Sequence, residues 1–246
     1  MSKKNDLCLV MPCYRSKKKV LNVIRKIDFN LVDHLIVIDD GCPQKTGLFI
    51  EKNFKSKKIS IVICNKNQGV GAATIKGIKI ALKKRYKFIG KIDSDGQHNP
   101  KDLKKFIYMI KKEKTEFCKA FRVLNFSRRK KMPYVRLFGN FFLTLIFRIV
   151  SGKFYVKDVT NGYLIFSAKV IRSIDLNNLK KNYFFEQDLL INVLSQNFKI
   201  SQIKIDTIYN NENSNLKPLN TIIPFIIYYL RILKKNFSKN FSNSLF

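Results

Sequence analysis

Short apolar runs alternate with segments of helical spacing, and this alternation constrains the fold more than any other feature of the sequence. Leu7–Met11 and Leu35–Ile38 have the length of buried strands, and apolar residues recur at helical spacing within Lys17–Ile27. Further strand-like runs follow at Ile59–Cys64 and Phe88–Ile92. Strands that alternate with helices predict an α/β domain with a mostly parallel sheet flanked by helices.

In the second half of the chain, the sequence pattern predicts fewer strands and longer apolar helices. We expect a helix after Pro100, a strand near Glu116–Lys119 and a helix from about Tyr134 to Val150. The segment 125–131 is polar and basic and predicts a loop. We expect a catalytic domain at 1–215 and an amphipathic, basic extension at 216–246.

The charge of the chain points to an anionic partner. Lys and Arg number 48 against 17 Asp and Glu, which gives a formal net charge of +31. Phospholipid, phosphorylated lipid, nucleotide and nucleic acid all fit this charge, and a biased composition accounts for the excess equally well. We expect no nucleic acid, because the basic residues are scattered and accompany no nucleic-acid motif.

Cysteine usage and hydropathy predict a cytoplasmic protein at the inner face of a membrane. The five cysteines show no paired metal-ligand spacing, which predicts free thiols. The first apolar run is too short for a signal peptide. Leu137–Val150 and Thr221–Leu233 are apolar, but Arg148 and Arg231 interrupt them, and both fall short of the roughly 20 residues of a membrane span. Both can instead lie on the membrane surface.

Oxygen-bearing side chains follow the predicted strand at Phe88–Ile92. Asp93, Asp95 and Gln97 come directly after it, beside Gly96. Ligands of open α/β sheets bind beyond the carboxyl ends of the strands, and paired carboxylates hold hard divalent ions such as Mg²⁺ or Mn²⁺. Such an ion can neutralise a departing diphosphate. An ordinary acidic turn ahead of the next helix remains the alternative.

Five motifs occur in an order that resembles one family. VMPCYRS, IVIDDGCPQKTG, NKNQGVGAATIKG, KIDSDGQHNP and DVTNGY together resemble family 2 glycosyltransferases with the GT-A fold. The resemblance covers roughly Leu7–Ile205 and is closest to the polyprenyl-phosphate glycosyltransferase branch. It implies inverting, metal-dependent transfer from a UDP- or GDP-linked sugar in cell-envelope glycan synthesis. NKNQGVG lacks the third glycine of a dinucleotide fingerprint, which excludes an NAD site.

The resemblance also implies roles for individual residues. It places the metal on Asp93, Asp95 and Gln97, with Mg²⁺ or Mn²⁺ as the cofactor. The residues expected to bind the donor are Pro12, Tyr14, Asp39, Asp40, Asp93, Ser94 and Lys217. Ser16 and Cys42 depart from the family pattern, which has a glutamate and a serine at these positions. Ser16 puts one expected donor contact in doubt.

The acceptor side depends on whether the acceptor is a lipid phosphate or a saccharide hydroxyl. The resemblance implies that Arg122, Arg136 and Asn140 contact a polyprenyl phosphate, and the planar guanidinium suits phosphate oxygens. A hydroxyl acceptor needs a base, and Asp188 is then the expected one. The predicted catalytic residues are therefore Asp95, Arg122 and Asp188.

Two further features keep other interpretations open. The basic run 128–131 and the segment PFIIYYLRILKKNFSKNF predict contact with an anionic membrane surface, although solvated surface and a partner-binding helix fit them too. A non-enzymatic basic module that has kept an old fold is the remaining rival. Turnover of a nucleotide-sugar would distinguish the enzyme from this non-enzymatic module.

Overall fold

The computed structural model describes residues 6–122, 134–196, 198–206, 224–225 and 227–230, with side chains from residue 138 onward in the second of these ranges. The chain divides into two compact units. One contains Met1–Val123 and Asn161–Ile208, and the other contains Leu124–Thr160 and Tyr209–Phe246. The first unit is therefore discontinuous in sequence. The predicted boundary at residue 215 stays a prediction.

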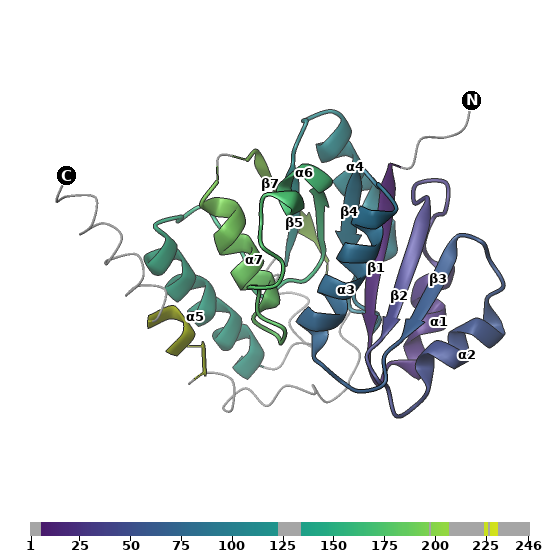
Figure 1. Ribbon diagram of the computed structural model, residues 1–246. Helices are drawn as coiled ribbons and strands as arrows, with labels where there is room; N and C mark the ends of the chain where they lie inside the picture. Colours follow the sequence, from purple (N-terminus) through teal and green to yellow (C-terminus); the bar gives the residue numbers. More distant parts are fainter. Residues whose placement is uncertain (1–5, 123–133, 197, 207–223, 226, 231–246) are drawn as a thin grey trace. The chain divides into compact units, whose positions relative to one another are not determined.

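Seven strands form one sheet in the described part of the first unit, in the order β3-β2-β1-β4-β6-β5-β7 (Figure 1). Their bounds are β1 Leu7–Cys13, β2 His34–Asp39, β3 Ile59–Ile63, β4 Phe88–Lys91, β5 Phe117–Arg122, β6 Leu164–Ser167 and β7 Ile200–Ile205. Neighbouring strands pair in parallel except at β6, which runs antiparallel to both β4 and β5. This mostly parallel sheet confirms the predicted α/β class.

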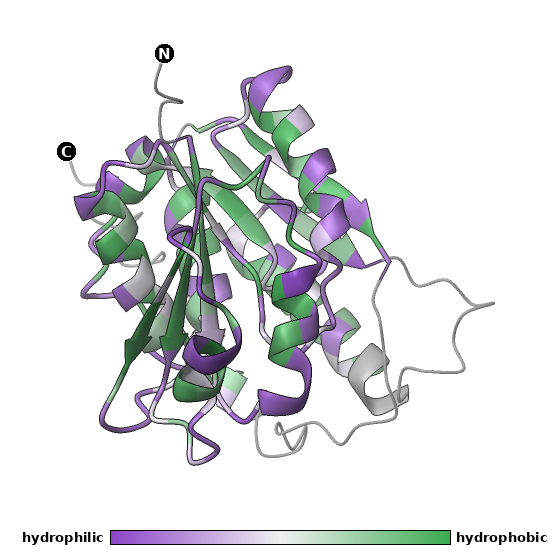
Figure 2. Ribbon diagram, turned by 90° about the vertical axis from the view of Figure 1, so that its right-hand side faces the viewer, coloured by the Kyte–Doolittle hydropathy of each residue, from purple (hydrophilic) through white to green (hydrophobic). Residues whose placement is uncertain are grey.

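Helices pack on both faces of the sheet. Their bounds in the first unit are α1 Lys17–Arg25, α2 Thr46–Asn53, α3 Val70–Lys83, α4 Leu103–Lys111, α6 Ala168–Arg172 and α7 Phe185–Leu194, with a 3-10 turn, η1, at Pro100–Asp102. α3 packs on β1 and β2, and α4 packs on β5 and β7. Side chains of β1 alternate between the faces: Val10 meets α3, while Leu9 and Met11 join the core beneath α1 and α4. Figure 2 shows hydrophobic residues concentrated in the strands.

α2 was not predicted, and its local sequence explains why. The helix has eight residues, and Lys45 precedes it in the left-handed conformation without a side-chain cap. Leu48 is 49% exposed, so the helix lacks a clean apolar face. By contrast, α4 begins where its signals predict: Pro100 opens the turn, and the Asn99 side chain accepts a hydrogen bond from the N–H of Lys101.

The second unit contains α5, Tyr134–Ser151, which agrees with the predicted helix. Residues of this unit pack on its inner side: the Arg148 Nε donates to the Val156 carbonyl, and the Phe147 ring meets Tyr229 edge to face. Phe225 and Tyr228 are also buried. None of the helices within the described ranges combines the length and hydropathy needed to cross a bilayer.

Gly77 lets α3 lie close against β1. A Cβ at this position would overlap the Cγ1 of Val10, which is fully buried. We therefore expect Gly77→Ala to lower the free energy of unfolding by about 1–3 kcal/mol through overpacking, measured by urea denaturation. Gly139→Ala is the control, because a Cβ there meets nothing within 4 Å and alanine favours a helix. Equal stability of the two variants would contradict this account.

Candidate active site

The predicted metal ligands lie in the loop that follows β4. Asp93 is 30% exposed at its side chain, and the Oδ1 of Asp95 accepts a hydrogen bond from the backbone N–H of Gln97 at 2.9 Å. Gly96 adopts φ +79°, which tightens this turn. The loop therefore places two carboxylates and an amide side chain within five residues, as the sequence predicts.

A buried lysine lies directly behind these carboxylates. Lys91, the last residue of β4, is 1% exposed at its side chain, and its Nζ lies 2.5 Å from Asp93 Oδ1. The same Nζ lies 2.9 Å from Oε1 of Glu186 in the first turn of α7. Burial acts to lower the Lys91 pKa, but the charges of Asp93 and Glu186 outweigh it and raise the pKa above its ordinary value. The ammonium therefore stays charged.

His98 and Tyr163 form the wall beside Asp93. The His98 Nδ1 lies 3.6 Å from Asp93 Oδ2, and its ring stacks on Tyr163 at a centroid distance of 5.1 Å. Tyr163 in turn packs against Phe106 of α4. Burial lowers the His98 pKa, which favours the neutral ring. These contacts hold His98 as a packed hydrogen-bonding residue in the wall of the site.

The two carboxylates carry opposite pKa shifts. Burial raises the pKa of Asp95, and the negative charge of Asp93 raises it further. For Asp93, burial acts upward, but the positive charge of Lys91 outweighs it and lowers the pKa. The opposite shifts follow from the contact of Asp93 with Lys91.

The residues present fit a hard divalent cation. Asp93, Asp95 and Gln97 offer carboxylate and amide oxygens, which are the ligands that Mg²⁺ and Mn²⁺ take in proteins. Within the described ranges, no group of three or more Asp, Glu, His and Cys side chains is arranged to hold a metal ion. A cation held by two carboxylates keeps coordination positions for phosphate oxygens, which suits a nucleotide-binding site.

Asp39 and Asp40 hold the loops at the carboxyl ends of β2 and β3. Asp39 is 1% exposed and accepts hydrogen bonds from the N–H groups of Cys42 and Gly47 at 2.7 and 2.5 Å. Asp40 is 2% exposed and accepts from Gln68 and Gly69 at 2.9 and 2.8 Å. The predicted contacts of Asp39 and Asp40 with the donor stay predictions. The structure shows that both carboxylates hold the backbone of the loops that follow β2 and β3.

The loop after β1 joins the loop after β4. Pro12 is buried within β1, whereas Tyr14 is 37% exposed, and the guanidinium of Arg15 lies over its ring. Ser16 donates a hydrogen bond to the Ser94 hydroxyl at 2.9 Å. Ser16, which departs from the family pattern, therefore connects the two loops that carry predicted donor-binding residues.

Arg122 ends β5, which β6 separates from β4 in the sheet, and its positive charge acts to lower the pKa of Asp93. Asn140 lies in α5 of the second unit, where its Oδ1 accepts a hydrogen bond from the Thr160 hydroxyl at 3.1 Å. The side chain of Arg136, residue Lys217 and the basic run 128–131 lie outside the described residues.

Glu186, not Asp188, reaches the Asp93 carboxylate through Lys91. The Oδ2 of Asp188 accepts a hydrogen bond from the backbone N–H of Lys180 at 2.9 Å. The role of Asp188 as a base stays a prediction. The sequence patterns predicted no role for Lys91. A lysine inside an otherwise apolar strand was the available signal.

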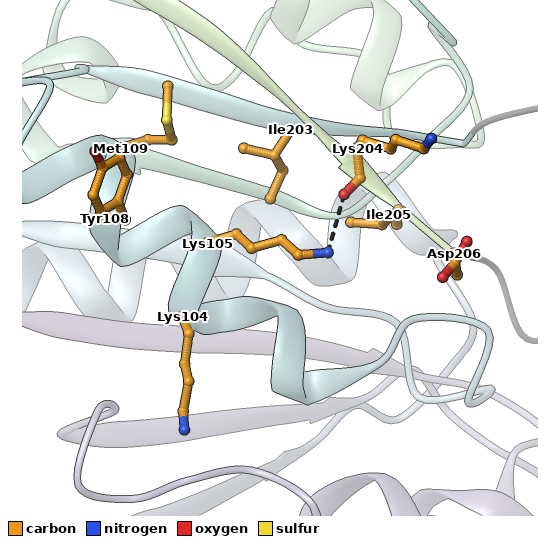
Figure 3. A pocket seen from close by; sticks show the side chains of 8 residues that line it. All are labelled: Lys104, Lys105, Tyr108, Met109, Ile203, Lys204, Ile205 and Asp206. Atoms are coloured by element: carbon orange, nitrogen blue, oxygen red, sulfur yellow. Dashed lines mark hydrogen bonds between the residues drawn. The ribbon is translucent and has the colours of Figure 1, made fainter.

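A separate groove of about 670 Å³ lies between α4 and the edge strand β7 (Figure 3). Lys105 extends across it to donate a hydrogen bond to the Lys204 carbonyl at 3.2 Å. Tyr108, Met109 and Ile203 contribute apolar surface. None of its lining residues is a predicted site residue.

The fold and the loops at the carboxyl ends of β1, β2 and β4 define a class of enzyme. Residues 8–175 match the Glycosyl transferase family 2, and the chain belongs to that family. It is 28% identical to UDP-N-acetylglucosamine--dolichyl-phosphate N-acetylglucosaminyltransferase of Methanococcus voltae, over 92% of this chain and 95% of that protein. It is 22% identical to polyprenol monophosphomannose synthase of Mycolicibacterium smegmatis, over 80% of this chain and 75% of that protein.

A solved structure supports the fold. The chain is similar to glucosyl-3-phosphoglycerate synthase from Mycobacterium tuberculosis, crystallised with Mn²⁺, uridine diphosphate and phosphoglyceric acid. The TM-score is 0.67 at 15% identity, over 93% of this chain and 77% of that one. The prediction of the family, its branch and the GT-A fold is confirmed.

The two carboxylate oxygens of Asp40 accept hydrogen bonds from backbone N–H groups, and this allows a test of its structural role. We expect Asp40→Ala to lower the free energy of unfolding by about 3 kcal/mol, because two backbone N–H groups lose hydrogen bonds to a charged group. Asp40→Asn keeps one acceptor oxygen and should lose about half as much. Urea denaturation measures both. An alanine variant as stable as the wild type would show that these bonds do not hold the loop.

Proposed function

We propose that the protein is an inverting glycosyltransferase that moves a sugar from a nucleotide-sugar to a polyprenyl phosphate at the inner face of a membrane. The observation that carries this proposal is the carboxylate pair Asp93 and Asp95 at the carboxyl end of β4 in a family 2 domain. The names of the M. voltae and M. smegmatis relatives, both lipid-phosphate sugar transferases, support this acceptor class.

The donor would lie over the carboxyl ends of β1, β2 and β4. Pro12, Tyr14, Asp39 and Asp40 lie at or just beyond the ends of β1 and β2, and they would hold its base and ribose. Ser94, beyond the end of β4, would also contact the donor. Asp93, Asp95 and Gln97 would hold Mg²⁺ or Mn²⁺, which when bound neutralises the negative charge that develops on the departing diphosphate. Lys217, which lies outside the described residues, would also contact the donor.

If the acceptor is a phosphate, the basic residues have a role in binding it. The reaction then needs no general base. The acceptor oxygen is already an anion, so it can attack the anomeric carbon opposite the departing diphosphate without losing a proton. Arg122, with Arg136 and Asn140, would orient the phosphate. Glu186 and Asp188 would then shape the acceptor side, and neither would remove a proton.

An exposed apolar stripe on α5 supports attachment to a membrane surface. Phe138, Phe141, Leu145 and Ile149 lie at helical spacing on one side of α5 and are 70%, 56%, 39% and 60% exposed. Phe154 and Tyr155, which follow the helix, are also exposed. A helix with such a face in a strongly basic chain suits the boundary between anionic headgroups and acyl chains.

The carboxylate pair gives the main test of the proposed function. We expect release of nucleoside diphosphate from a UDP- or GDP-sugar to require Mn²⁺ or Mg²⁺ and a short-chain polyprenyl phosphate. Asp95→Ala should lower kcat/KM by at least about a hundredfold, because metal stabilisation contributes several kcal/mol to such a transition state. Asp188→Asn is the matched comparison, and it should retain most lipid-phosphate transfer.

Other outcomes would change the assignment. If a saccharide supports turnover, the lipid phosphate does not and Asp188→Asn is inactive, the acceptor is a hydroxyl. If no donor gives metal-dependent release with either acceptor class, the chain is a binding module that has kept the fold.

The α5 stripe gives a second test. Phe141→Ser/Ile149→Ser should weaken binding to vesicles that contain anionic phospholipid by at least about tenfold, because each side chain loses on the order of 1 kcal/mol or more of apolar burial. Sedimentation with vesicles measures the change. Tyr108→Ser on α4, which removes a side chain that is 52% exposed, is the control and should bind as the wild type does. Unchanged binding of the double variant would contradict the membrane role of α5.

A further inference from the structure

Lys91 brings a fixed positive charge into a cluster of carboxylates that carries the proposed metal ligands. Its Nζ contacts Asp93 Oδ1 and Glu186 Oε1, and it lies 3.5 Å from the Gly162 carbonyl oxygen. The side chains of Lys91 and Glu186 are 1% and 10% exposed. At this burial the charges interact strongly, because little water screens them.

The cluster joins three segments that are distant in sequence. Lys91 ends β4, Gly162 precedes β6 and Glu186 lies in the first turn of α7. A Cβ at Gly162 would lie 2.6 Å from Lys91 Nζ and 3.1 Å from both Asp93 Oδ2 and Glu186 Oε1. The three charged groups therefore surround one position that has no side chain, so only glycine fits there without displacing them.

Lys91 and a divalent cation would act on the same carboxylate. Lys91 contacts Oδ1 of Asp93, while Oδ2 faces the side of Gly162 and His98. The ammonium fixes the orientation of the carboxylate, but its positive charge also reduces the negative potential that attracts a second cation. Glu186 works in the opposite direction, because it adds negative charge and shares the Lys91 ammonium with Asp93.

We propose that Lys91 is a positioning residue that orients Asp93 and, balanced by Glu186, sets the affinity of the site for a divalent cation. This inference rests on the metal role in the proposed function. In this proposal the start of α7 is linked electrostatically to the metal ligands. A change of charge at Glu186 therefore alters the electrostatic potential at Asp93 through the Lys91 ammonium.

The proposal predicts effects of opposite sign for two neighbouring substitutions. Lys91→Met removes a positive charge, so divalent-cation affinity should rise about tenfold, while turnover falls because Asp93 loses its fixed orientation. Glu186→Gln removes a negative charge and leaves Lys91 with Asp93 as its ionised partner, so cation affinity should fall about tenfold. Lys91→Met/Glu186→Gln should return the affinity to within about threefold of the wild type, because the two charge changes cancel.

The experiment measures Mn²⁺ binding to the full chain in the presence of uridine diphosphate and, separately, of guanosine diphosphate, by the electron paramagnetic resonance signal of free Mn²⁺. This readout is independent of turnover. Lys87→Met is the matched control: Lys87 immediately precedes β4, its side chain is 52% exposed, and it pairs with Asp6 at 3.2 Å. It should leave Mn²⁺ affinity unchanged. Circular dichroism confirms that each variant is folded.

The double variant keeps the test decisive if Lys91→Met does not fold. That failure would follow from a buried Glu186 left without its partner, whereas removal of both charges is tolerated far better. The comparison is then between Glu186→Gln and the double variant. Removal of the Lys91 charge in the Glu186→Gln background should restore the lost affinity.

Three outcomes are distinguishable. Opposite shifts, or restoration in the double variant, support the proposal. If the wild type binds Mn²⁺ but both single variants weaken binding, or neither changes it, the cluster is only a structural ion pair and the role of Lys91 is overturned, while the metal role in the proposed function stands. If the wild type binds no Mn²⁺ with either uridine or guanosine diphosphate, the metal role and this inference both fail.

Discussion

Parallel pairing of β1 with β2 on one side and β4 on the other is the constraint on which the site depends. In this register Cys13 lies opposite Asp39, and Val10 lies opposite Lys91. The N–H of Ile92 still donates to the Val10 carbonyl, so the loop that carries Asp93 and Asp95 begins immediately beyond the last β1–β4 pair. The loops after β1, β2 and β4 therefore leave the sheet at one edge, and the Ser16–Ser94 hydrogen bond joins two of them.

Burial of charge at this edge is costly, and the structure offsets the cost by pairing. Asp39 and Asp40 receive backbone N–H donors, and Lys91 receives two carboxylates. A buried ion pair adds little to stability relative to apolar packing, but loss of one partner is strongly destabilising. The pairing therefore fixes the orientation of the carboxylates but adds little to the free energy of unfolding.

Sequence patterns predicted those features that depend on neighbours along the chain. The buried strands, the helical spacing in α1, and the carboxylates directly after β4 all follow from local periodicity and from the rule that ligands bind beyond strand ends. α2 was missed because its eight residues carry neither a cap nor a clean apolar face. The antiparallel direction of β6 and the contact of Lys91 with Glu186 depend on topology, which brings together residues that are distant in sequence. No local pattern contains that information.

The discontinuity of the first unit has a consequence for synthesis of the chain. β6 lies between β4 and β5, yet it follows both of them in sequence, beyond residues 124–160. At ordinary translation rates the ribosome needs several seconds to add the residues between β5 and β6. During that interval the facing edges of β4 and β5 lack the strand that joins them, and Lys91 lacks Glu186. A nascent chain that stalls there exposes open edges on β4 and on β5, which also lacks β7, and open strand edges are surfaces that promote aggregation.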